Sequence, residues 1–418
     1  MRGFITRAVA VAGVLLFVLL QVPPALLAAY PPGPPVRVPA EAAPPAAIPP
    51  GQPGQSLLVI APHPDDETLA AGGLMARAVS RGDTVTVVVL TDGDGSLPTA
   101  RLFGGATHNA FLAAGRTRRE EVNSAVRRLG VAPSDLFTLG LPDGYLERLW
   151  HRHWSDVAPF SSPTTGLDRA PYGNRLPYSG SALFEVLLKL IVSRRPSAIY
   201  FPAYTDLHPD HSATYRFALA AVAASGRSPA LFTYQIHGRG DDTGPWIDLT
   251  GEEMATKRAA LAEHKTQMRV AGQLLTQFLR RTEKFGRGVW SGASKAEWVA
   301  GPAFLRSHIA GDRSLEVSFR PPEKGRTKNG QYAAVVHTFV MADQIGQGRR
   351  MGESGSGLFQ VALRHGRGDE FSASVPLARL GLGRLDEVTS AVVVVSVEDP
   401  TNRTRQSSVV PTIAIRVR

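Results

Sequence analysis

Three carboxylates and one imidazole follow directly after an apolar stretch near residue 60. The sequence VIAPHPDDETLAAGG runs from Val59 to Gly73 and places His63 shortly before Asp65, Asp66 and Glu67. Adjacent carboxylates repel one another, and a bound cation would remove that repulsion. His63 and Asp66 are three residues apart, so in a tight turn that enters a helix both side chains can face the same point. The spacing therefore predicts that His63 and Asp66 bind a metal ion.

A second motif, DLHPDHSA from Asp206 to Ala213, repeats this chemistry after another apolar stretch. His211 would complete a set of two imidazoles and one carboxylate, and three protein ligands with one open position are typical of catalytic zinc. Zinc lowers the pKa of a water molecule from about 16 to about 7. A hydrolase also needs a carboxylate base and an imidazole beside the metal, and Asp65 and His208 are free for these roles. We expect Asp210 to orient His208 and to keep it charged.

Each motif taken alone has a plain structural alternative. A His-Pro-Asp sequence is a common turn, and clustered acids can be the solvated start of a helix. The two motifs together favour chemistry, because both follow expected strands of one sheet, and ligands bind beyond the carboxyl ends of such strands. The other histidines have no such neighbours in the sequence. We interpret them as surface or core residues: His108, His151, His153, His237, His264, His308, His337 and His365.

The elements that must position these motifs alternate between strands and helices from Ser56 onwards. SLLVIA and TVTVVVL are apolar and β-branched, as buried parallel strands are, and the sequence between them has helical spacing. The alternation predicts an α/β fold: a Rossmann-like open, mostly parallel sheet with helices on both faces. A charge-rich amphipathic helix is expected over Arg116–Gly130. Gly93–Gly115 and Tyr145–Gly180 are expected to be long irregular loops, which are usually lids or binding loops.

The pattern changes at both ends of this α/β region. Arg2 and Arg7 precede an apolar run from Ala8 to Leu20, which predicts a signal peptide or signal anchor and therefore an exported protein, extracellular or membrane-anchored and facing outside the cytoplasm. A Pro-rich stretch follows as a linker. Near the other end, short β-branched stretches joined by Gly, Pro and Asp predict a small β-sandwich-like accessory domain. We therefore divide the chain into residues 1–30, 31–55, 56–305 and 306–418.

The composition limits the chemistry further. The 418 residues include no cysteine, so any metal must be held by His, Asp and Glu, and thiolate nucleophiles are excluded. The net charge of +10 is consistent with contact to an anionic membrane or cell-wall surface. No basic stretch carries interleaved aromatic residues, so we expect no nucleic-acid partner.

With both motifs in view, the chain resembles the PIG-L/LmbE family of zinc-dependent N-acetylglucosamine de-N-acetylases. APHPDDETLAAGG and HPDH carry the resemblance, RREEVNSAVRRLG and LGLPDG support it, and it covers roughly Ser56 to Phe285. It implies contacts of Arg118 and Asp143 with the sugar or its aglycone. It further implies one Zn²⁺ per chain, for which other divalent metals could substitute. The residue roles implied for the two motifs are the ones given above: His63, Asp66 and His211 as ligands, Asp65 as general base, and His208 with Asp210 acting on the oxyanion or leaving group.

The resemblance implies a hydrolase that removes an N-acetyl or similar acyl group from an amino sugar. Export, the Pro-rich linker and the added C-terminal domain distinguish the chain from the cytosolic enzymes that act on thiol precursors. A glycan, a glycolipid or a secreted glycosylated metabolite is therefore the expected substrate. Two alternatives stay open: another zinc amidohydrolase, and a non-catalytic glycan-binding protein of the cell surface. The second is disfavoured, because all the ligands and both proton-transfer residues are present.

Overall fold

A computed structural model of the chain describes residues 54–288, apart from 155, 174, 204–205, 226, 228 and 239–243, together with eight strands between residues 304 and 417. The expected signal segment and nearly all of the expected Pro-rich linker lie outside the described residues. Among the helices that the structure describes, none is both long and apolar enough to cross a membrane.

Five parallel strands and one antiparallel edge strand form the central sheet, in the order β3-β2-β1-β4-β5-β8. Their bounds are β1 (Ser56–Ala61), β2 (Thr84–Thr91), β3 (Leu136–Leu141), β4 (Ala198–Pro202), β5 (Ala230–Tyr234) and β8 (Gly286–Gly288). The central strands are buried along nearly their whole length, as sheets covered on both faces are. The predicted mostly parallel α/β sheet is confirmed.

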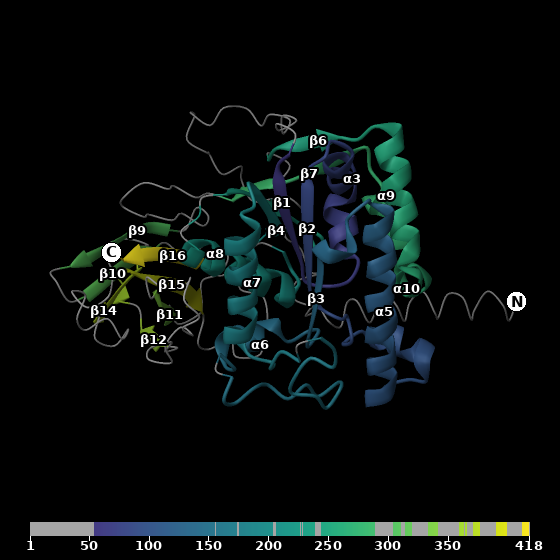
Figure 1. Cartoon of the computed structure of the whole chain (residues 1–418). Coiled ribbons are helices and arrows are strands. Elements are labelled where there is room, and N and C mark those ends of the chain that lie inside the picture. Colours follow the sequence, from purple (N-terminus) through teal and green to yellow (C-terminus); the bar gives the residue numbers. More distant parts are fainter. Residues whose placement is uncertain are drawn as a thin grey trace, which may run out of the picture. The chain divides into compact units, whose positions relative to one another are not determined.

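Helices cover both faces of this sheet (Figure 1). On one face α3 (Asp66–Ser80) and α5 (His108–Arg128) both contact α9 (Gly251–Glu263). On the other face α8 (Pro209–Ser225) contacts α7 (Gly180–Arg194) and α6 (Leu146–His151). α3 and α8 follow β1 and β4 directly, so the first turns of these two helices lie at the carboxyl edge of the sheet.

The segment Gly93–Gly115 is not the irregular loop that its sequence predicts. It contains α4 (Leu97–Ala100) and the first turns of α5. The Thr107 side chain caps α5 by accepting the N–H of Ala110 at 3.2 Å. The first turns of α5 also bury one face, and the helix therefore begins upstream of Arg116. The second expected loop, between β3 and α7, begins with α6 and has no further helix or strand among its described residues.

A buried ion pair stabilises a kink in α3, the helix that begins within the acidic motif (Asp65, Asp66 and Glu67). The helix departs from helical geometry at Ala71, where φ is −137° and ψ is 19°. The two N–H groups after the kink both donate to the Glu283 carboxylate of β7 (Thr282–Lys284), each at 2.8 Å. Lys257 of α9 binds the same carboxylate at 2.7 Å and donates to the carbonyl of Leu69 at 2.9 Å. These contacts satisfy two N–H groups and one carbonyl at the kink.

We expect Glu283→Ala to lower the free energy of unfolding by about 3–5 kcal/mol, because the change leaves the buried Lys257 charge without its counter-ion and two N–H groups without an acceptor. Denaturant unfolding followed by tryptophan fluorescence measures this change. Glu263→Gln is the control, since Glu263 pairs with the exposed Arg128 side chain and such surface pairs contribute about 1 kcal/mol or less. Equal unfolding midpoints for the two variants would contradict the proposed role of the pair.

Beyond residue 304 the described residues are all in strands. They form two four-stranded antiparallel sheets, in the orders β13-β14-β10-β9 and β12-β11-β15-β16. Their bounds are β9 (Phe304–Ala310), β10 (Ser314–Phe319), β11 (Ala333–Met341), β12 (Phe359–Ala362), β13 (Arg364–His365), β14 (Phe371–Pro376), β15 (Ser390–Glu398) and β16 (Thr412–Val417). The sandwich-like arrangement and the boundary at residues 305/306 stay predictions.

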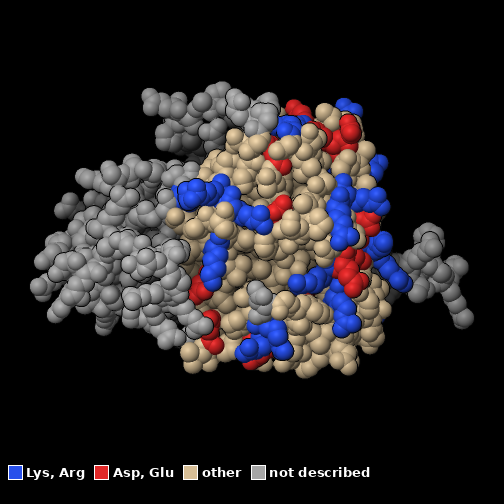
Figure 2. Space-filling model, viewed as in Figure 1, with Lys and Arg blue, Asp and Glu red and all other residues tan. Residues whose placement is uncertain are grey.

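Charges of both signs are interspersed on the face drawn in Figure 2. Basic and acidic side chains alternate along the edge that carries α5 and α10 (Lys265–Leu275). Arg128 of α5 pairs with Glu263 of α9 at 2.8 Å. On the described part of this face, the net positive charge is therefore not gathered into one basic patch.

Candidate metal centre and catalytic site

The sheet brings the two motifs together. β1 leads into His63 and Asp66, and β4 leads into Asp206 and His211 at the start of α8. β1 and β4 are parallel neighbours, so the residues that follow them meet at one edge although His63 and His211 are 148 positions apart in the chain.

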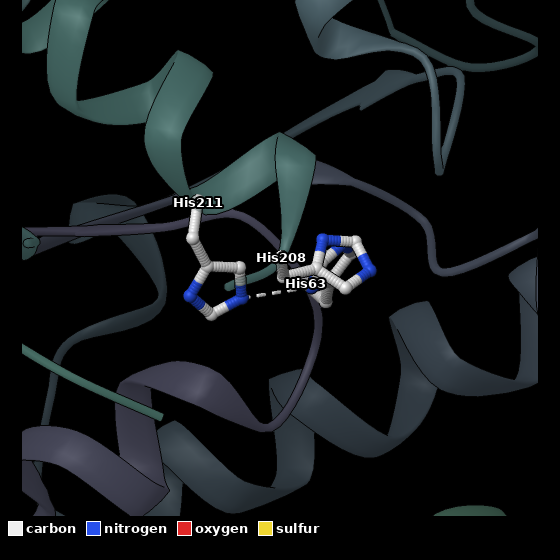
Figure 3. A group of neighbouring side chains, drawn as sticks. All are labelled: His63, His208 and His211. Carbon is white, nitrogen blue, oxygen red and sulfur yellow. Dashed lines mark hydrogen bonds between the residues drawn. The ribbon is translucent and has the colours of Figure 1, made fainter. Parts of the chain in front are cut away.

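Three donor atoms form a nearly regular triangle at this edge. His63 Nδ1 lies 3.0 Å from Asp66 Oδ2, His211 Nε2 lies 3.1 Å from the same oxygen, and the two ring nitrogens are 3.3 Å apart. Figure 3 shows these two rings with His208 beside them. In a tetrahedral zinc site with ligands at about 2.0–2.1 Å, the donor atoms are about 3.3 Å from one another. If both of these ring nitrogens carried a proton, their N–H groups would repel each other at this distance. If both carry a lone pair, they can bind one cation together with the Asp66 oxygen.

The outer nitrogen of each ring is held by a carboxylate. His63 Nε2 lies 3.1 Å from Asp143 Oδ1 and 3.3 Å from Asp210 Oδ2, and His211 Nδ1 lies 3.1 Å from Asp206 Oδ2. Such partners favour a proton on the outer nitrogen and leave the inner lone pair free for a metal, as is usual for metal-binding histidines. The three donors and their partners therefore fit a divalent cation.

Asp206 belongs to the second motif, but its sequence context assigned it no role. Its Oδ2 accepts the Nδ1–H of His211, and the N–H groups of Ile236 and His237 donate to the same oxygen at 2.8 and 3.1 Å. Burial alone would raise the pKa of Asp206, but the His211 imidazole outweighs it and lowers the pKa to about 2. Asp206 is therefore an ionised carboxylate that orients His211, one of the expected metal ligands.

We expect Asp206→Asn to weaken metal affinity by about 10–100-fold, the usual effect of losing a carboxylate behind a ligating histidine. Competition with a chromophoric chelator measures the affinity. Asp168→Asn serves as the control, because the Asp168 side chain is half exposed and pairs with Arg169 at the surface. Wild-type affinity in a folded Asp206→Asn protein would show that His211 needs no such partner.

Asp65 and Asp66 are adjacent but lie in different environments. Asp65 adopts a φ of 129°, a left-handed conformation that is strained for a residue with a side chain. Its N–H donates to Glu67 Oε2 at 3.0 Å, and its carboxylate lies 3.5 Å from Arg118. Burial raises the pKa of Asp65 to about 7, against the opposing charge of Arg118. A carboxylate with such a pKa suits general base catalysis near neutral pH.

Arg118 lies beneath the turn that carries Asp65. Its guanidinium donates to the carbonyls of Gly93 at 3.0 Å and Pro64 at 2.7 Å, and its Nε is buried with no hydrogen-bond partner among the described residues. The side chain is only 4% exposed, so its evident role is to brace this turn. Its expected contact with the sugar stays a prediction.

Asp143 is placed at the site by the end of β3. Besides the contact with His63, its Oδ2 accepts the N–H of Gly95 at 2.9 Å. Burial would raise the pKa of Asp143, but the His63 imidazole outweighs it and holds the pKa well below its usual range. Asp143 thus orients His63, one of the expected metal ligands, a role that the sequence did not predict. Its contact with the sugar remains an expectation.

The expected pairing of Asp210 with His208 is corrected by the structure. The Asp210 carboxylate accepts the N–H groups of Gly144 at 2.7 Å and Leu146 at 2.9 Å, and it lies beside His63. His208 Nδ1 instead accepts the main-chain N–H of Asp210 at 3.2 Å. Burial and the His63 imidazole hold the pKa of His208 well below its usual range, so the side chain is neutral rather than charged.

Two histidines that were interpreted as surface or core residues lie at or beneath the site. His264 is buried, and its Nε2 lies 3.0 Å from Glu67 Oε1 under the acidic motif. The His237 ring centroid lies 4.8 Å from that of His211 and 5.1 Å from that of His208. Burial lowers the pKa of His237 to about 4, against the carboxylate of Asp206. The position of His237 just after a predicted strand was the signal that could have revealed it.

Residues 58–222 match the family described as PIG-L, GlcNAc-PI de-N-acetylase. A 1D-myo-inositol 2-acetamido-2-deoxy-alpha-D-glucopyranoside deacetylase from Rhodococcus erythropolis is 30% identical over 172 residues, which are 40% of this chain and 53% of that protein. The protein of the same name from Nocardia farcinica is 32% identical over 171 residues, 40% of this chain and 52% of that protein. This chain therefore spans about half the length of these two relatives.

Among solved structures, the N,N'-diacetylchitobiose deacetylase from Pyrococcus horikoshii is 21% identical to this chain, with a TM-score of 0.39. The match covers 55% of this chain and 82% of that one.

Proposed function

Because residues 58–222 are a domain of the PIG-L family, we propose that this protein is a metal-dependent hydrolase that removes an N-acetyl or similar acyl group from an amino sugar. The observation that carries the proposal is the triangle of donor atoms from His63, Asp66 and His211, with Asp65 and His208 beside it. We propose zinc as the metal, since two imidazoles and one carboxylate are a common catalytic zinc set.

The residues around the triangle have separate roles in amide hydrolysis. A divalent cation held there would supply Lewis acidity, which polarises the acyl carbonyl and makes water a nucleophile near neutral pH. Asp65 takes a proton from the attacking water as the new carbon–oxygen bond forms. His208, whose ring lies 4.7 Å from that of His63, donates a hydrogen bond to the acyl oxygen or the departing nitrogen. The carbon–nitrogen bond breaks, the proton that Asp65 took from water passes to the departing nitrogen, and the products are acetate and a free amine.

We further propose that the substrate lies outside the cytoplasm. The apolar run from Ala8 to Leu20 and the Pro-rich stretch after it support export, and the net charge of +10 supports contact with an anionic membrane or cell-wall surface. The names of the two curated relatives support a 2-acetamido-2-deoxy-glucopyranoside as the sugar. A glycan, glycolipid or glycosylated metabolite with such a sugar is the proposed substrate.

Acetate release from a substrate panel tests this function. The full-length protein, loaded with Zn²⁺, is incubated with N-acetylglucosamine, N,N'-diacetylchitobiose, an N-acetylglucosaminyl inositol and N-acetylated amino acids. We expect acetate from at least one of the sugars and none after metal removal by a chelator. Release from the amino acids alone would favour another zinc amidohydrolase. A protein with one metal per chain that is inactive on every compound would contradict the proposal.

A further inference from the structure

The four imidazoles at the site differ in their exposure. His63 and His211 are buried, whereas His208 and His237 are half-buried. The buried pair supplies two corners of the donor triangle, and a molecule that enters the site meets the half-buried pair. We infer that His237 is a catalytic residue whose ring N–H donates a hydrogen bond to the acyl group of the substrate. This inference rests on the function proposed above.

Main-chain hydrogen bonds fix the position of His237 relative to His211. Its N–H donates at 3.1 Å to Asp206 Oδ2, the oxygen that also accepts the Nδ1–H of His211. Its carbonyl accepts the N–H of Leu207 at 3.2 Å and the side chain of Gln235 at 3.0 Å. The backbone of His237 is therefore hydrogen-bonded to the second motif, and a catalytic group needs such a fixed backbone to keep its geometry.

The His237 ring lies close to the donor triangle without joining it. One ring nitrogen of His237, one oxygen of Asp66 and one nitrogen of His211 all lie within 4.8 Å of one another. Within the described residues, the ring of His237 makes no hydrogen bond or ion pair. Asp66 and His211 already bond to each other and to further partners. Nothing in the described part of the chain occupies the ring nitrogens of His237, so they can bond to a ligand.

A small polar group beside the triangle would be within reach of this ring. The oxygen of an acyl group gains negative charge as the amide is attacked, and a fixed N–H aimed at it stabilises that charge. His208 and His237 have ring centroids 5.1 Å apart, so they can flank the same group. His208 would then serve the departing nitrogen, while His237 serves the acyl oxygen.

Two substitutions at one position separate the hydrogen bond from the shape of the ring. His237→Phe keeps a ring but removes the N–H, and His237→Gln keeps an N–H donor. His108→Ala, at the exposed start of α5, is the control. For each protein we would measure metal content, melting temperature, kcat and KM for acetate release, and the affinity of the Co²⁺-substituted protein for acetate from its visible absorption.

We expect His237→Phe to keep its metal and melting temperature and to lose about 10²-fold in kcat, the usual loss for one such donor. Acetate should bind about 10-fold more weakly, and His237→Gln should recover part of both losses. Unchanged kcat and unchanged acetate affinity would overturn the inference, and so would loss of the metal from a folded His237→Phe protein, which would make His237 a ligand. If the wild-type protein releases no acetate from any sugar, the proposed function fails, and the acetate titration alone decides the role of His237.

Discussion

Asp65→Asn will keep the bound metal and lower kcat by about 10²–10⁴-fold, the range typical of a general base. The amide has nearly the same shape as the carboxylate but cannot take a proton from water. Since the strained main chain at Asp65 is held by Glu67, the substitution should leave the turn intact. The measurement is kcat for acetate release, with metal content determined on the same sample. Because the pKa of Asp65 is about 7, wild-type activity should also fall as the pH is lowered through that value and the base becomes protonated.

Asp66→Asn is the matched comparison, one residue along the chain. Asp66 Oδ2 contacts both His63 Nδ1 and His211 Nε2, so this variant should lose metal and activity together. If Asp65→Asn loses the metal while Asp66→Asn keeps it, the two roles are exchanged. Full activity in both variants would end the hydrolase interpretation of this motif.

His211→Ala will remove most of the metal and, with it, all measurable acetate release. The His211 side chain is fully buried and supplies one of the three donors of the triangle, and the remaining two cannot hold the ion tightly. Elemental analysis after dialysis should show about one metal per wild-type chain and far less than one per variant chain. His153→Ala is the control, because His153 packs on Phe160 outside the donor triangle.

A His211→Ala protein with stoichiometric metal would mean that the ion binds elsewhere. Melting temperatures of both proteins, taken with and without added Zn²⁺, provide a second readout. Added Zn²⁺ should raise the melting temperature of the wild-type and His153→Ala proteins, since a ligand that binds only the folded state stabilises it. It should leave His211→Ala unchanged.

The residue types and their local spacing were enough to predict the sheet and to select three residues whose side chains meet in the structure. Apolar stretches with β-branched residues, such as Leu57–Ala61, are typical of covered strands, and parallel strands present their carboxyl ends at one edge. Two motifs that each follow such a strand must therefore lie near each other. This reasoning selected His63, Asp66 and His211, and the structure brings the three together at 3.0–3.3 Å.

The partners of these residues were decided by the tertiary structure alone. Sequence proximity suggested that Asp210 holds His208, yet its carboxylate accepts N–H groups from the segment after β3, which is 64–66 residues away in the chain. His237 looked isolated, because nothing near it in the sequence is a metal ligand, and β5 carries it to the cluster. Local spacing determines which side chains one turn can present, whereas the order and register of the strands determine which turns meet. A sequence pattern specifies the side chains of each turn, and only the packed sheet specifies which turns lie together.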